Sequence, residues 1–278
     1  SKGRALQNMI NIQKGDKVCA FIHVKNLSDM EYVQNHYLIF ATKDGLMKKT
    51  TLESYSRPRA NGIIALGLRE DDRLIRVTLT DGNSQMLVAS YNGKVVRFPE
   101  DTVRPMGRTA TGVRAIKLDE DGQDRVIGMI CVEEGSKESV LVISEKGFGK
   151  RTDLDDENGE PIYRITNRGG KGVKCYKITE KTGDVVGVKA VTDENEIMMI
   201  TTEGIIIQIR VNEISVLKRI TSGVKLINLD EGVNVAQVAL VQREIPTPEY
   251  EEELAEEEFS EAQNRDIEKN NYALFWIL

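Results

Sequence analysis

Short apolar runs alternate with tight turns along the first 245 residues. Four stretches share one pattern: an apolar strand, a turn containing glycine, and a second strand. They span 39–50, 87–98, 141–152 and 198–209, with turn glycines Gly45, Gly93, Gly147 and Gly204. Asp-Gly and Asn-Gly between β-rich runs favour two-residue hairpins, because both central residues need a positive φ. The pattern therefore predicts four β-hairpins.

Two further units recur between the hairpins. One has a glycine followed by apolar and basic residues, at 59–68, 108–118, 169–178 and 219–229, and 3–12 resembles a degenerate fifth copy. The other is an apolar strand, at 17–24, 73–80, 125–132, 184–191 and 234–241. We predict four repeats of ~50–60 residues, flanked by partial units that are able to complete one blade together. The repeats are about 13–68, 69–118, 119–178 and 179–229, and the partial units are 1–12 and 230–243.

These repeats predict an all-β fold. Each repeat offers about four short strands and cannot bury both faces alone, so it must stack on its neighbours. Helical periodicity is not convincing anywhere in 1–245. A β-helix or a leucine-rich horseshoe would need a different repeat. We therefore expect a propeller-like array of four-stranded antiparallel blades, closed or nearly closed.

Charge divides the chain into two parts. The 278 residues carry a net charge of −6, but 249–269 alone contain ten acids and two bases. The remaining 36 bases and 34 acids give +2. We therefore expect a mildly basic body at 1–245 and an acidic tail at 246–278, partly disordered or helical. The tail ends in an apolar stretch, 271–278, that contains the only Trp.

Several classes of protein are disfavoured by composition. No apolar run approaches the ~20 residues of a membrane-spanning helix, and no apolar leader opens the chain, so neither a membrane span nor a secretion signal is expected. Cys19, Cys131 and Cys175 are far apart and odd in number. This disfavours a disulfide scaffold and paired zinc ligands, and favours a reducing compartment.

Familiar catalytic motifs are absent from the sequence. The two histidines, His23 and His36, lie in a strand and a loop and are interpreted as structural. The stretch 147–152 (GFGKRT) is too short for a phosphate-binding P-loop and lies in a hairpin rather than before a helix. The acids of 119–124 lack the spacing of an EF-hand, which favours a solvated turn. We expect no catalytic residue and no metal site.

Basic residues, in contrast, recur at matching places in the repeats. They follow the turn glycines, precede the next glycine unit, or come two places after its glycine. The full set is Lys48, Lys49, Arg57, Arg59, Lys94, Arg97, Arg104, Arg108, Arg114, Lys150, Arg151, Arg164, Arg168, Lys171, Lys174, Arg210, Lys218, Arg219 and Lys225. Matching positions of a radial array lie on one edge, so we predict a basic ring. The alternative is that hairpin tips and loops simply carry soluble charge.

A curved basic edge suits duplex DNA. The duplex carries one charge per ~1.7 Å of axis, and cations along it release counterions without reading bases. Bending 20–30 base pairs by 40–90° costs on the order of 1–6 kcal/mol, which evenly spaced arginines can offset. No recognition helix and few aromatic residues are present, so neither base readout nor single-strand stacking is expected.

Three stretches carry a resemblance to a known family: 103–118 (VRPMGRTATGVRAIKL), 147–152 (GFGKRT) and 195–215 (NEIMMITTEGIIIQIRVNEIS). Through them, 1–243 resembles the C-terminal domain of the DNA gyrase A subunit. The resemblance implies a β-pinwheel, a propeller variant whose blades exchange strands and wrap DNA around a positive perimeter. The family's diagnostic box is matched only in part, by 168–172 (RGGKG), without the leading glutamine and base.

The resemblance also implies a role within a larger enzyme. In the family, wrapping enables gyrase to introduce negative supercoils with ATP, while the catalytic tyrosine, ATP and Mg²⁺ act elsewhere in the holoenzyme. Implied partners are duplex DNA, the N-terminal cleavage core of the same polypeptide and the gyrase B subunit, in the bacterial cytoplasm. No membrane partner is implied, and the isolated fragment is expected to be a monomer.

Two other functions remain open. The related subunit of topoisomerase IV has a similar domain, and a propeller-type scaffold could bind protein instead of DNA. The acidic residues 249–261 either compete with DNA for the basic edge or form a solvated extension.

Overall fold

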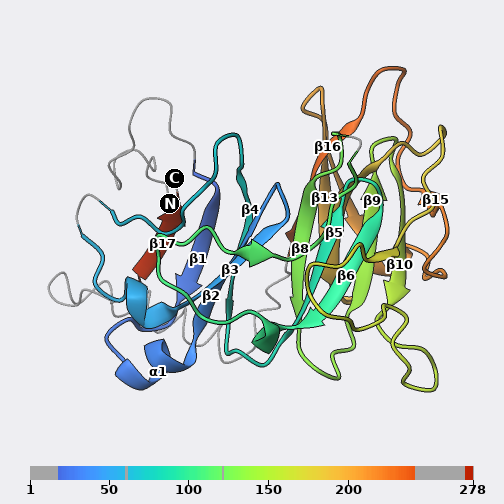
Figure 1. Ribbon diagram of the computed structural model, residues 1–278. Helices are drawn as coiled ribbons and strands as arrows, with labels where there is room; N and C mark the ends of the chain where they lie inside the picture. Colours follow the sequence, from blue (N-terminus) through green and yellow to red (C-terminus); the bar gives the residue numbers. More distant parts are fainter. Residues whose placement is uncertain (1–17, 60–61, 121, 242–272, 278) are drawn as a thin grey trace, which may run out of the picture.

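The computed structural model describes residues 18–59, 62–120, 122–241 and 273–277, which form five antiparallel sheets (Figure 1). Four of the sheets are blades of one ring, which confirms the predicted all-β, propeller-like architecture. The acidic residues 249–261 and the N-terminal unit 1–12 lie outside the described residues. None of the helices in the described part is long and apolar enough to cross a membrane.

Each blade is built on one of the four predicted hairpins. The hairpins are β2 (Tyr37–Thr42) with β3 (Leu46–Thr51), β5 (Gln85–Ser90) with β6 (Lys94–Pro99), β9 (Ser139–Ser144) with β10 (Phe148–Asp153), and β13 (Glu196–Thr201) with β14 (Ile206–Arg210). Their turn glycines all have positive φ, for example 83° at Gly45 and 69° at Gly93. Glycine adopts this conformation without the steric cost that other residues meet.

A longer apolar strand follows each hairpin and pairs with the hairpin's first strand. These strands are β4 (Leu74–Thr80), β8 (Val126–Val132), β12 (Val185–Val191) and β16 (Val235–Val241). The blades are thus divided differently from the predicted repeats, which grouped each apolar strand with the hairpin that follows it. β16, from the predicted partial unit 230–243, completes the last blade by pairing with β13. The order of units in the sequence does not specify which neighbour each strand pairs with.

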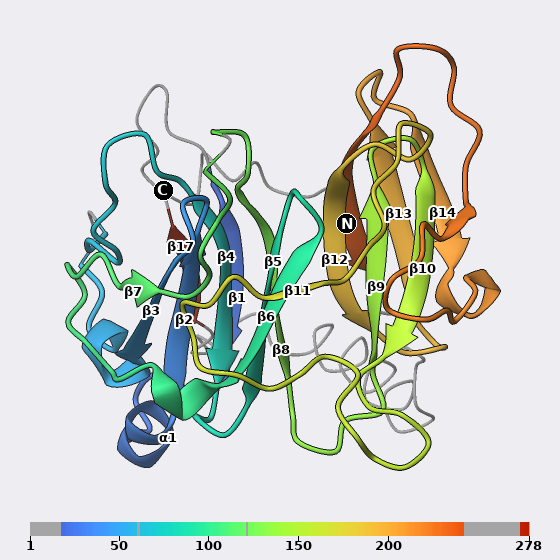
Figure 2. The same ribbon diagram turned by 45° about the vertical axis from the view of Figure 1, so that its right-hand side comes forward.

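In three blades, the outermost strand comes from the following repeat. These two-residue strands are β7 (Val113–Arg114), β11 (Val173–Lys174) and β15 (Val224–Lys225), and they pair with β3, β6 and β10 (β7 and β11 in Figure 2, β15 in Figure 1). Neighbouring blades therefore exchange strands. The fourth blade has three strands among the described residues, in the order β14-β13-β16. Ile205 and Ile206 are exposed where the other blades carry their outermost strand.

The fifth sheet joins the two ends of the described chain. β1 (Ala20–Val24) pairs with β17 (Ala273–Ile277), so the apolar end of the predicted tail contains a β-strand (Figure 1). Helix is limited, in the described ranges, to α1 (Met30–Asn35), capped by Asp29, and to short 3-10 turns. The turns η2 (Leu52–Tyr55), η3 (Glu100–Thr102) and η4 (Val211–Glu213) follow β3, β6 and β14.

Apolar side chains fill the spaces between neighbouring blades. One such core joins Leu87 and Ile130 of one blade to Val142 and Val188 of the next. Between the next two blades, Gly187 of β12 permits close packing, because a Cβ there would lie 2.7 Å from the Val238 side chain of β16. The inner strands β4, β8, β12 and β16, together with β1, surround a central cavity of about 620 Å³.

Candidate nucleic-acid interface

The outermost strands place three basic residues at equivalent points of the ring. Arg114 pairs with Leu46, Lys174 with Lys94, and Lys225 with Phe148. Each basic residue is the second residue of its strand, and each is exposed. These three residues, which the sequence repeats align with one another, therefore occupy the same structural position on three blades.

Each outermost strand is the end of a segment that crosses from one blade to the one before it. The crossovers span 104–117, 164–177 and 215–228, and we call their outward surface the rim. They first run parallel to a blade, through the bridges Lys49 to Pro105, Arg97 to Ile165 and Arg151 to Val216. Exposed or half-exposed basic residues follow or precede these bridges: Arg104, Arg108, Arg164, Arg168, Lys171, Lys218 and Arg219.

Direct hydrogen bonds join consecutive crossovers. The Arg168 guanidinium donates to the carbonyl oxygen of Arg114 at 3.3 Å, and the Arg219 guanidinium donates to the carbonyl oxygen of Lys174. The backbone N–H of Lys117 also donates to the Gly170 carbonyl at 2.8 Å. Because each of these arginines ties its own crossover to the one before it, the rim forms one continuous basic track across three blades.

A glycine controls how each crossover enters its outermost strand. Gly112, Gly172 and Gly223 have φ of 102°, 71° and 72°. A Cβ at any of them would lie 2.4 Å from a carbonyl oxygen of the neighbouring strand. Gly62 occupies the same place in the first repeat, yet a Cβ there would meet nothing within 4 Å. The close approach of this glycine to a neighbouring carbonyl oxygen therefore occurs only where a strand is exchanged between blades.

The first crossover also meets a basic pocket. Arg57, Arg59 and Arg108 line a surface pocket of about 410 Å³, together with Glu53 and neutral residues. Arg57 and Arg59 are exposed. Arg210 is also exposed, at the end of β14, where it lies 3.8 Å from Glu196. The structure thus extends the basic surface beyond both ends of the continuous track.

Five of the predicted DNA contacts are buried, and the prediction that they face solvent is wrong. They are Lys48, Lys49, Arg97, Lys150 and Arg151, each at most 7% exposed. Lys49 lies 2.7 Å from the buried Glu100. Arg97 contacts Asp155 at 3.1 Å, and Arg151 pairs with Asp193. These three charges are neutralised by carboxylates, so their side chains support the rim from beneath.

Lys48 and Lys150 have a distinct role as equivalent residues of β3 and β10. Lys150 Nζ donates to the carbonyl oxygens of Lys218, at 2.8 Å, and Arg219. Lys48 Nζ donates to the carbonyl oxygens of Ala65 and Arg108. Burial lowers the pKa of both ammonium groups to about 8. Each lysine fixes the backbone that presents rim arginines, which makes it a positioning residue rather than a DNA contact.

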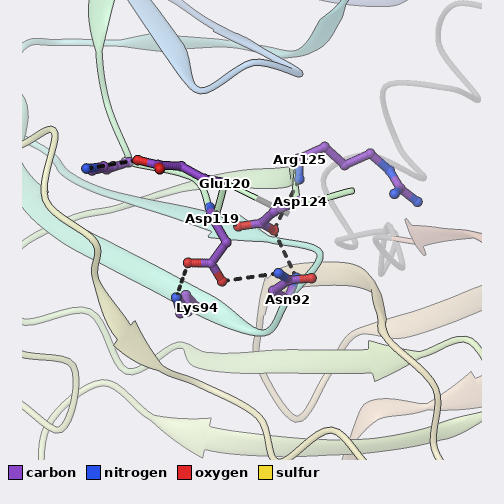
Figure 3. A network of polar contacts seen from close by, with 7 residues as sticks. Asn92, Lys94, Asp119, Glu120, Asp124 and Arg125 are labelled. Atoms are coloured by element: carbon purple, nitrogen blue, oxygen red, sulfur yellow. Dashed lines mark hydrogen bonds and ion pairs between the residues drawn. The ribbon is translucent and has the colours of Figure 1, made fainter. Parts of the chain in front are cut away.

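Lys94 belongs to a polar network around a hairpin turn (Figure 3). Its ammonium lies 2.5 Å from Asp119, whose carboxylate also accepts from the Asn92 amide at 3.1 Å. Asp124 accepts from the backbone N–H groups of Asn92 and Asp119, both at 3.0 Å. The acids of 119–124 thus include carboxylates that fasten the β5–β6 turn, rather than forming only a solvated turn. Within the described ranges, no group of three or more His, Cys, Asp or Glu is placed to hold a metal ion.

Two rim cations were not among the residues predicted from the sequence. Lys117 and Lys177 come three places after Arg114 and Lys174, and their backbone N–H groups donate to the next crossover at 2.8 and 3.1 Å. Lys177 is exposed, whereas Lys117 forms a 3.4 Å surface pair with Glu120. Their recurrence at one spacing is a signal that the sequence already contained.

The chain matches the family model described as "DNA gyrase C-terminal domain, beta-propeller" over residues 36–81, 85–133, 138–192 and 195–242. Each matched range contains one hairpin and the inner strand that follows it. The chain is 39% identical over 271 residues to the DNA gyrase A subunit of Staphylococcus aureus strain MRSA252, covering 98% of this chain and 29% of that protein. For strain NCTC 8325 / PS 47, identity is 40% over 261 residues, covering 94% and 28%. The chain therefore spans less than a third of these relatives.

Two solved structures have a similar fold. The crystal structure of the C-terminal domain of DNA topoisomerase IV has a TM-score of 0.78 and 25% identity, covering 92% of this chain and 75% of that chain. The structure of a DNA gyrase A C-terminal domain has a TM-score of 0.71 and 21% identity, covering 86% and 75%. At that identity, the second similarity concerns the fold alone.

Proposed function

Because the chain belongs to the DNA gyrase C-terminal domain family, we propose that it binds duplex DNA along the rim and bends it without reading bases. The continuity of the rim carries this proposal. Arg114 and Lys174 are each hydrogen-bonded through their carbonyl oxygens to an arginine of the next crossover. A duplex that follows these segments meets cations on three consecutive blades.

The physical basis is counterion release from the phosphate backbone. Each phosphate that a cation neutralises contributes about −0.9 to the slope of log K against log[salt]. Cations at equivalent points of a ring hold the duplex to a curved path, and the phosphate contacts made along that path offset a bending cost on the order of 1–6 kcal/mol. The exposed rim side chains of the described crossovers include no aromatic platform for unpaired bases. The proposal therefore concerns duplex DNA and no sequence preference.

We propose that, within the intact subunit, this bending enables the enzyme to supercoil DNA. A duplex held on the rim is presented to the cleavage core of the same polypeptide, and the gyrase B subunit supplies ATP hydrolysis. The catalytic residues, ATP and Mg²⁺ belong to those other parts of the enzyme, which acts in the bacterial cytoplasm. This chain contributes the DNA path alone, and in isolation it is a monomer.

Two variants with the same net charge test whether duplex DNA binds at the rim. The first replaces Arg114, Lys174 and Lys225 by Gln. The second replaces Arg73, Lys137 and Lys181 by Gln, exposed cations on connections beside the inner strands. Duplex binding is titrated by fluorescence anisotropy from 50 to 200 mM salt. The rim variant is expected to flatten the salt slope by about 2.7, at ~0.9 per contact. The matched variant should behave like the wild type; equal effects of the two variants would contradict the proposal.

The topoisomerase IV subunit is a second candidate, favoured by the TM-score of 0.78 to its C-terminal domain. It predicts the same binding, so the two candidates are separated by complementation. The chain is joined to a gyrase cleavage core, and negative supercoiling is measured with ATP. Restored supercoiling supports the gyrase role, whereas relaxation or decatenation alone supports the topoisomerase IV role. A protein-binding scaffold predicts no duplex binding even at low salt.

A further inference from the structure

The central cavity concentrates positive charge in a region that the proposed DNA contact does not use. It measures about 620 Å³ and is lined by residues of β1, β4, β8, β12 and β16. Arg76 on β4 and Lys189 on β12 are among the lining residues, as is His23 on β1. No Asp or Glu is among the residues that line it in the described part of the chain. The cavity is therefore cationic.

Among the residues that the structure describes, neither principal cation has an acidic partner. The ion pairs among the described residues involve neither Arg76 nor Lys189. Burial, and after it the nearby Arg76 charge, lower the pKa of Lys189 to about 8. The two cations thus lie close enough to repel each other. Lys189 is half-buried and Arg76 is exposed on the cavity lining, and an anion bound between them would offset their mutual repulsion.

The surrounding backbone adds hydrogen-bond donors. Each of β4, β8, β12 and β16 is the edge strand at one end of its sheet. Alternate residues of an edge strand direct both their backbone N–H and C=O groups away from the partner strand, and here that direction is toward the ring centre, so the N–H groups are available to an oxyanion. Thr78 and Gln237 contribute neutral polar side chains to the same lining. The cavity therefore combines two cations with uncharged donors, as oxyanion sites do.

We propose that the central cavity binds an oxyanion of the phosphate class, held between Arg76 and Lys189. The guanidinium group offers a planar pair of donors to two phosphate oxygens, and the ammonium group offers a point charge. The cavity also has room for a phosphate that carries an organic group, since small-molecule sites measure ~300–1,000 Å³. Inorganic phosphate and nucleoside triphosphate are the two sources to compare.

The test measures thermal unfolding of the full chain against added phosphate, with ionic strength held constant by chloride. A ligand that binds only the folded state raises the Tm as its concentration exceeds Kd. Phosphate should raise the Tm of the wild type. In R76Q and K189M, the concentration needed for the same shift should rise at least tenfold. Without phosphate, K189M should unfold at or above the wild-type Tm, because it removes a desolvated charge that Arg76 repels.

The rim triple variant R114Q/K174Q/K225Q is the matched control, and isothermal titration calorimetry is the second measurement. Phosphate should bind this variant as it binds the wild type, which separates the cavity from the DNA surface. ATP measured in the same way identifies the source: binding of either ligand that depends on Arg76 and Lys189 supports the proposal. Absence of binding by both ligands, or a phosphate effect that is lost only in the rim variant, overturns it.

Discussion

Replacing Lys150 by Met tests whether a buried ammonium group positions the rim. Lys150 Nζ donates to the carbonyl oxygens of Lys218 and Arg219 and to Thr152 Oγ1 at 3.1 Å. Methionine fills a similar volume but donates nothing, so the two carbonyl oxygens lose a charged donor. Burial lowers the pKa of this ammonium to about 8, so desolvation opposes the hydrogen bonds in part.

These opposing effects set the stability that K150M should lose. Each hydrogen bond to a charged group contributes about 1.5–3 kcal/mol, so two contribute about 3–6 kcal/mol. After an offset for no longer burying an ammonium group, we expect K150M to lower the free energy of unfolding by about 2–4 kcal/mol. K225M, on the exposed outermost strand, should change it by less than about 0.5 kcal/mol.

Urea unfolding followed by circular dichroism measures the stability, and duplex titration across salt concentrations measures the DNA contact. K225M should lose about 0.9 of the salt slope, which K150M should retain at temperatures where it is folded. If K150M unfolded like the wild type and lost the same slope as K225M, Lys150 would be a DNA contact and not a positioning residue.

Three further outcomes are expected. In the unfolded chain the Lys150 ammonium keeps its proton up to about pH 10.5, but in the folded chain only up to about pH 8. Between these pH values the unfolded state binds more protons, so the free energy of unfolding of the wild type should rise with pH relative to that of K150M. A difference in urea midpoints that stays constant with pH would contradict this. G172A should lower the free energy of unfolding by about 3 kcal/mol or more, because it combines a φ of 71° with a 2.4 Å approach to the Val95 carbonyl oxygen. G62A, with similar φ and open space, should cost about 1 kcal/mol, and equal costs in thermal unfolding would refute the strand-exchange explanation. E100Q should destabilise by about 3–5 kcal/mol because it leaves Lys49 buried without its counter-charge, whereas E120Q, at an exposed pair, should change little in the same urea assay.

The sequence was sufficient to predict the hairpins and the equivalent positions of three rim cations. Glycine at positive φ marks each turn, and the recurring glycine unit aligns Arg114, Lys174 and Lys225 in the sequence alone. Strand assignment within a blade could not be predicted in the same way. β4 and β5 are close in sequence yet belong to different sheets, because pairing depends on contacts between repeats.

Burial of basic residues was the least predictable feature of the candidate site. In an ordinary half-exposed strand, adjacent Lys48 and Lys49 would place at least one side chain in solvent. Here both faces of β3 are covered, and both lysines are buried. The partners that neutralise such residues, including Glu100, Asp155 and Asp193, come from distant parts of the chain. Charge pattern alone therefore could not separate rim cations from those beneath them.

The central claim is that the rim bends duplex DNA. The most direct measurement is the end-to-end distance of a duplex labelled with donor and acceptor dyes, followed by energy transfer as the chain is added at low salt. The distance should shorten, return to its free value as salt is raised, and shorten less with R114Q/K174Q/K225Q than with R73Q/K137Q/K181Q. A duplex that binds without any change in end-to-end distance, or that shortens equally with both variants, would contradict the claim.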